Sequence, residues 1–224
     1  MRRLNRAFFV GVALIGACGR PVPDAAPAVP APATSLVDDC APVTFDLVDA
    51  NDVEISGDLD QQKQAMAEWA LDRFDQADLL LPSRIHVGFD PDRSMCGGAA
   101  GICRPRHVPP EALVCEPDDG FMAQQLWQRI TLLHELAHLW HWSQGDGTGW
   151  PDLQAIVGGE THDPTAPWAE RTEERVAVVV SWGLLDQYRR PVRSDLACVE
   201  LYEQFVGLTG RPPLGPVEIV CIPD

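Results

Sequence analysis

A histidine–glutamate–histidine pattern offers the clearest chemistry in this chain: His134, Glu135 and His138 form the run H-E-x-x-H. In an α-helix, residues four apart lie on one face a single turn apart, so His134 and His138 can point at one ion. Neutral imidazoles bind zinc at about 2.0–2.1 Å, and a carboxylate beside them can take a proton from an activated water. The run therefore predicts one bound Zn²⁺, with Glu135 as the general base.

A catalytic zinc site needs a third protein ligand and keeps one position open for water. The metzincin class places a glycine three residues, and a histidine six residues, after the second histidine of the run. This chain has His141 and Gln144 at those two positions. The metzincin arrangement is therefore excluded.

Two downstream regions offer the third ligand. His162 and Asp163 lie in a long segment rich in Gly, Pro and Asp, residues 145–167, whereas a predicted helix over residues 168–188 carries Glu173 and Glu174. A loop ligand is poorly preorganised unless it is braced. Helical spacing favours Glu174, because its face is small and apolar enough to pack against the helix that carries the run. That face also holds Ala177, Val178, Ser181 and Leu185.

The elements that would position these residues follow from hydrophobic spacing. Alternation and β-branched residues predict strands, and apolar residues at helical spacing predict helices. The strands are expected at 43–48, 84–89 and 111–115, and the helices at 60–80, 121–143, 168–188 and 196–208, with a loop at 90–101. Strands followed by helices indicate an α+β fold, and the strand at 84–89 is a candidate edge for an added peptide strand.

The N-terminus resembles a targeting sequence. Residues 1–17 combine three early arginines with a short apolar stretch, which is typical of a signal peptide. Ile15-Gly16-Ala17-Cys18 resembles a bacterial lipobox, in which Cys18 is lipidated and becomes the first residue of the mature protein. Residues 18–35 then form a Pro/Ala-rich linker, and the folded domain is expected over residues 36–224. We therefore expect an exported lipoprotein, anchored to a membrane in the periplasm or at the cell surface.

Charge narrows the range of partners. The formal net charge is -16, and without the three arginines of residues 1–17 the chain has 14 basic against 33 acidic side chains, a net charge of -19. So acidic a surface repels nucleic acid and anionic headgroups. Nucleic acid is therefore not an expected partner.

Six cysteines follow Cys18, and an even number in an exported chain indicates three disulfides. Pairing of Cys198 with Cys221 would hold the C-terminal tail. Pairing of Cys103 with Cys115 would brace the segment before the helix at 121–143. No C-x2-C pair is present, which argues against a cysteine-ligated zinc site.

The region from residue 134 to 185 resembles a group of small bacterial gluzincin-type zinc metallopeptidases. Their pattern is HELAHAW, a loop, W-x-x-R-x-x-E-x-x-A and a later W-G-L. This chain has HELAHLW, then Trp168, Arg171, Glu174, Ala177 and Trp182-Gly183-Leu184. Gly101-Ile102-Cys103 and Val114-Cys115 also resemble that group. The resemblance implies a zincin-like fold, a small sheet followed by two helices, with zinc ligands His134, His138 and Glu174 and the general base Glu135.

Two positions depart from the expected pattern. His141 stands where the group tends to have an acidic residue, and Val178 stands where better-known gluzincins have an aspartate that orients the first histidine. Another residue must therefore orient His134. His141, His162, Tyr188 and Arg171 are candidates for that outer shell or for the oxyanion donor.

The function expected from these features is zinc-dependent hydrolysis of peptide bonds in the cell envelope or outside the cell. The substrate would be a peptide or a protein. The alternative is a non-catalytic zinc-containing envelope lipoprotein that binds a partner protein through residues 145–167.

Overall fold

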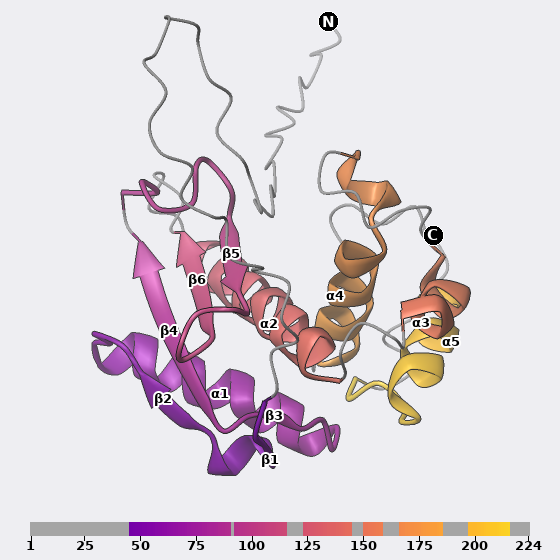
Figure 1. Cartoon of the computed structure of the whole chain (residues 1–224), viewed down its shortest axis with the longest axis horizontal. Helices are drawn as coiled ribbons and strands as arrows, with labels where there is room; N and C mark the ends of the chain where they lie inside the picture. The colour runs from indigo at the N-terminus through magenta and orange to yellow at the C-terminus, as the bar shows by residue number, and fades with distance from the viewer. Residues whose placement is uncertain are drawn as a thin grey trace, which may run out of the picture.

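The computed structural model describes residues 45–90, 92–115, 123–144, 150–158, 166–185 and 197–215. They form an α+β fold, as predicted, in which the strands come first and most of the helices follow. Figure 1 shows the strands over α1 and α2, with α4, α3 and α5 on the far side of α2 from the sheet. The predicted lipidation site Cys18, the linker and the candidates His162 and Tyr188 lie outside the described residues.

The main sheet has four strands in the order β2-β4-β6-β5: β2 (Glu54–Ser56), β4 (Arg84–Asp90), β6 (Glu111–Cys115) and β5 (Gly101–Arg104). The pairs β2–β4 and β4–β6 are parallel, and β5 pairs antiparallel with β6. All five residues of β6 are buried, as expected for a strand covered on both faces. β1 (Leu47–Val48) and β3 (Leu81–Pro82) form a separate two-stranded sheet.

The sheet order corrects two expectations. The strand over 84–89 is interior, paired with β2 on one side and β6 on the other, so it has no edge for an added peptide strand. Among the described residues, the sheet ends next to α2 at β5, which starts at the last residue of the predicted loop 90–101. Its four residues are too few for the alternation on which a strand prediction depends.

Helices α1 (Gln61–Gln76) and α2 (Ala123–Ser143) cover the inner face of the sheet. Asp60 begins α1 because its side chain accepts a hydrogen bond from the Lys63 backbone N–H at 2.9 Å, the usual N-cap contact. In α2, Leu132, Leu136 and Leu139 are at most 1% exposed. α2 is buried because it packs against β5 and β6 on one side and against α4 on another.

The predicted helix over 168–188 is two elements. Trp168–Glu170 is a short 3-10 turn (η2), Arg171 is extended, and α4 runs over Thr172–Gly183. Val176, Val179 and Val180 are each 0% exposed, because α4 lies between α2, α3 and α5. Gly183 is required where α4 meets α5 (Cys198–Thr209), since a Cβ there would lie only 2.0 Å from Cδ2 of the Phe205 ring.

The predicted long loop 145–167 contains a helix, α3 (Trp150–Val157). Its apolar residues Leu153, Ile156 and Val157 follow helical spacing, and Pro151 is compatible with a first turn. The Gly, Pro and Asp content on both sides of this short stretch concealed the pattern. Among the described residues, no helix combines the length and hydrophobicity that a membrane span requires.

One predicted disulfide is wrong. Cys115 is bonded to Cys96 and not to Cys103. Cys115 ends β6 facing away from α2, where it packs with Cys96 and Ala99, whereas Cys103 faces the main core. The alternation of side chains along paired strands therefore excludes the predicted pair. Cys198 is also disulfide-bonded, and Cys221 lies outside the described residues.

Candidate metal centre

The H-E-x-x-H residues lie in the middle of α2, where it packs against α4. His134 and His138 are 6% and 8% exposed, and Glu174, in the first turn of α4, is 2% exposed. Their ligand atoms all lie within 4.8 Å of one another. These three residues were predicted to meet, and the structure brings them together; Glu173 and His141 are not members of the group.

The separations of the donor atoms fit a small ion. Oε2 of Glu174 lies 3.2 Å from Nε2 of His134 and 3.4 Å from Nε2 of His138. Ligand atoms at about 2.0–2.1 Å from a tetrahedral ion are about 3.3 Å apart. Two imidazole nitrogens and one carboxylate oxygen also leave the fourth position open. The group could therefore hold a metal ion.

Burial and charge shift the pKa values of these groups in the metal-free protein. Burial lowers the pKa of His134. Burial also acts to lower the pKa of His138, but the charge and hydrogen bond of Glu174 outweigh it and the pKa is raised. Burial acts to raise the pKa of Glu174, and the neighbouring imidazoles outweigh it, so that the pKa is lowered. Glu174 is therefore a carboxylate that is ready to accept a cation.

Glu135 sits in a different environment on the same helix. It is 3% exposed, and burial raises its pKa to about 8, against the opposing effect of His138. Its side chain lies against Gly101 at the start of β5: a Cβ on Gly101 would lie 2.5 Å from Oε1 of Glu135 and 2.7 Å from Cγ2 of Thr131. The absence of a side chain at 101 makes room for Glu135.

Two further residues contact the group from the N-terminal side of α4. Nη2 of Arg171 lies 3.3 Å from Oε1 of Glu174. The Trp168 ring stacks on His134, with centroids 6.3 Å apart and planes at 22°. Arg171 was expected to be an outer-shell or oxyanion candidate, and the structure gives it a contact with Glu174. His141 is buried on α2.

Sequence reasoning missed the contribution of Gly101. The available signal was weak, because a glycine beside a cysteine-bearing loop reads as part of a turn. Only the packing of β5 on α2 shows that Gly101 faces a carboxylate.

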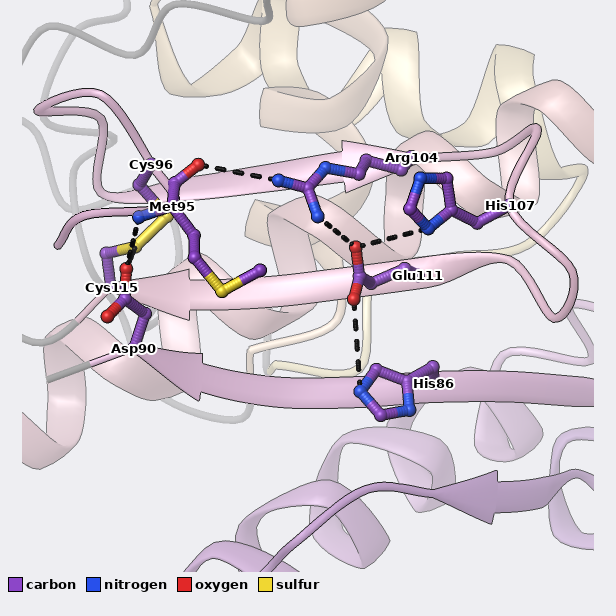
Figure 2. Close-up of polar contacts among 8 residues, drawn as sticks. All are labelled: His86, Asp90, Met95, Cys96, Arg104, His107, Glu111 and Cys115. Carbon is purple, nitrogen blue, oxygen red and sulfur yellow. Dashed lines mark hydrogen bonds and ion pairs between the residues drawn. A yellow bond between two sulfur atoms is a disulfide. The ribbon is translucent and has the colours of Figure 1, made fainter.

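A second polar cluster lies on the outer face of the sheet, away from α2 (Figure 2). Glu111 is held by Arg104, whose Nη1 is 2.6 Å from Oε2, and by His107 and His86 at 3.6 and 3.8 Å. Arg104 neutralises the charge of Glu111, the carboxylate that a metal ion would need as a ligand in this cluster. The cluster therefore ties neighbouring strands together and does not resemble the metal centre.

Asp90, Cys96 and Cys115 also lie close together at the other end of this face. Cys96 and Cys115 form a disulfide, as Figure 2 shows, and a disulfide has no thiolate to offer a metal. Asp90 instead accepts hydrogen bonds from the backbone N–H groups of Asp92 and Met95. Asp90 and the disulfide therefore fix the loop that follows β4 to the end of β6.

The chain matches no protein-family model, no curated protein and no solved structure at a significant level. Function must therefore be inferred from the residues and their geometry.

Proposed function

We propose that this protein is a zinc-dependent metallopeptidase with a zincin-like α+β fold. The proposal is based on the buried cluster of His134, His138 and Glu174, in which Glu135 follows the first of these residues directly. Two imidazole nitrogens, each at a tetrahedral separation from one carboxylate oxygen, are a donor set typical of catalytic zinc. A resident Zn²⁺ supplies Lewis acidity, which activates water and polarises a carbonyl group.

Glu135 is the proposed general base. A catalytic base functions best when its pKa lies near the working pH, and burial moves the pKa of Glu135 to about 8 in the metal-free protein. A cation held nearby would lower that pKa by direct electrostatics. Glu135 would take a proton from water as the water oxygen bonds to the scissile carbonyl carbon, and would give that proton to the amine nitrogen as the C–N bond breaks.

The proposed binding position for the peptide is the outer edge of β5, where the sheet ends in the part of the chain that the structure describes. An exposed edge strand binds an extended chain through backbone hydrogen bonds. β5 ends the sheet on the side of α2, and its first residue, Gly101, lies beside Glu135. A peptide paired with β5 would therefore run past the general base. Export and anchoring through Cys18 would place this activity at a membrane surface outside the cytoplasm.

The decisive test combines metal analysis with a Glu135→Gln variant. The purified protein should contain about one zinc per chain and cleave members of a peptide library, and a chelator should abolish cleavage. Glu135→Gln should keep the metal and lose about 10²–10⁴-fold in rate, the usual contribution of a general base. Glu173→Gln is the matched control, because it removes a neighbouring carboxylate that is not in the metal group.

Equal cleavage by wild type and Glu135→Gln would refute the catalytic assignment. Bound zinc without cleavage of any peptide would favour the alternative, a zinc-containing lipoprotein that binds a partner. Absence of zinc from the protein would contradict both.

A further inference from the structure

The two oxygens of Glu174 have different neighbours. Oε2 faces the imidazoles of His134 and His138 at 3.2 and 3.4 Å, whereas Oε1 lies 3.3 Å from Nη2 of Arg171. One oxygen is thus directed to the ligand group and the other is directed away from it. A carboxylate with both oxygens free can bind a metal through either one or through both.

The start of α4 explains why Arg171 can reach Glu174. Arg171 is the N-cap residue, with φ -81° and ψ 125°, and Glu174 is at position N3. In a capping box the N3 side chain folds back toward the N-cap residue. Here the N-cap residue is an arginine that makes no side-chain cap hydrogen bond. Its guanidinium instead meets the returning carboxylate.

Arg171 is an unusual residue to bury beside a cation site. It is 3% exposed, and a guanidinium does not lose its proton in a protein. Its charge repels a bound metal ion and so weakens metal binding by direct electrostatics. If Arg171 helps metal binding, it does so by fixing the position of Oε1 of Glu174, and not through its charge.

We propose that Arg171 is a positioning residue that holds Oε1 of Glu174 and leaves Oε2 as the single ligand oxygen. This inference rests on the proposed function, because it assigns Glu174 as a metal ligand. Single-oxygen ligation keeps the fourth position open for water or substrate, which a catalytic site requires. Val178 stands where an aspartate would orient His134, and the outer-shell role of Arg171 is a different one, because Arg171 contacts the third ligand, Glu174.

The sign of the change in metal affinity tests the proposal. Zinc affinity of the purified protein is measured by competition with a chromophoric chelator for wild type, Arg171→Met, Arg171→Lys and Arg171→Gln. Positioning predicts that Arg171→Met binds zinc about 10- to 100-fold more weakly, the usual cost of losing an outer-shell partner. Arg171→Gln keeps a donor and should fall between that variant and wild type.

Cobalt(II) substitution provides a readout of geometry. Visible absorption by cobalt weakens as the coordination number rises. Release of Oε1 should therefore lower the absorption of the Arg171→Met and Arg171→Lys proteins relative to wild type. Arg171→Lys keeps the charge but loses the planar fork, so it remains informative if Arg171→Met does not fold.

Arg175→Met is the matched control, because Arg175 lies on the same helix and its Nη1 donates to the Val157 carbonyl at 3.3 Å. It should leave zinc affinity and the cobalt spectrum unchanged. Variants of Arg171 that bind zinc as tightly as wild type, or more tightly, would overturn the positioning role. Failure of wild type itself to bind zinc would instead overturn the proposed function.

Discussion

At the scale of single residues, the surroundings of Glu174 and Glu135 shift the pKa values of these two carboxyl groups in opposite directions. Burial acts to raise the pKa of Glu174, but the imidazoles of His138 and His134 outweigh it and keep that pKa low. Glu135 lies against Gly101, and burial raises its pKa to about 8. When the pKa values of two neighbouring acidic groups are shifted apart, the group with the low pKa stays ionised and the group with the raised pKa can transfer a proton. This contrast supports a ligand role for Glu174 and a proton-transfer role for Glu135.

The raised pKa of Glu135 predicts a pH dependence of stability in the metal-free protein. Its ordinary pKa is 4.5 and its folded pKa is about 8. Between these values the folded state keeps a proton that the unfolded state has released. The stabilisation is therefore complete below about pH 4.5 and is lost as the pH rises through about 8.

Urea denaturation at a series of pH values, with chelator present, measures this effect. The free energy of unfolding of wild type relative to Glu135→Gln should fall by up to about 1.4 kcal/mol per pH unit in that window. Both proteins retain His134, His138 and Glu174, so the difference reports the titration of Glu135 together with its effect on the pKa of His138. A difference that stays constant from pH 5 to pH 8 would contradict the buried, protonated state of Glu135.

At the scale of elements, the site depends on how closely β5 and α4 approach α2. α2 carries His134, His138 and the proposed base Glu135, α4 carries Glu174, and β5 lies beside Glu135. The contact between β5 and α2 leaves no space for a side chain at position 101. The glycine is therefore a packing requirement of the site.

Gly101→Ala should displace Glu135 or move β5 away from α2. Overpacking of this kind costs about 1–3 kcal/mol of stability, and a misplaced base should reduce cleavage by at least about tenfold. Thermal unfolding and peptide cleavage measure the two effects. Gly88→Ala is the control, because its Cβ would clash with the end of the Leu113 side chain on the outer face of the sheet and otherwise make ordinary contacts. Loss of activity in Gly88→Ala but not in Gly101→Ala would refute this role.

At the scale of the whole molecule, the candidate metal centre joins the two halves of the fold. α2 packs on the sheet, and α4 packs on α3 and α5, so their shared interface connects the strands to the C-terminal helices (Figure 1). An ion bound only by the folded protein stabilises the whole domain. Metal removal should therefore affect global unfolding.

Chelation should lower the melting temperature of the full-length protein. Zinc at about 100 times its Kd contributes about 2.7 kcal/mol, which corresponds to about 5–10 °C for a domain of this size. Scanning calorimetry with and without chelator measures the shift. His138→Ala lacks one member of the ligand group, so chelator should leave its melting temperature unchanged. A wild-type protein that is indifferent to chelator would show that the metal does not support the fold.

The sequence by itself identified which residues of the candidate centre meet. Helical spacing places His134 and His138 on one face and selects Glu174 over Glu173, because such spacing depends only on local geometry. The α+β order of elements followed from hydrophobic patterns for the same reason. The local patterns were misleading where elements are short or flanked by glycine and proline, as at β5 and α3.

Only the tertiary structure decided the remaining features. Strand order made β4 interior and, among the described residues, β5 an edge, and strand register put Cys115 on the face opposite to Cys103, where it is bonded to Cys96. Packing of distant segments placed Gly101 against Glu135. The extended Arg171 at the start of α4 brought its guanidinium to the second oxygen of Glu174. These features depend on contacts between distant segments, or on the extended residue between η2 and α4. Neither cause produces a periodic pattern in the sequence.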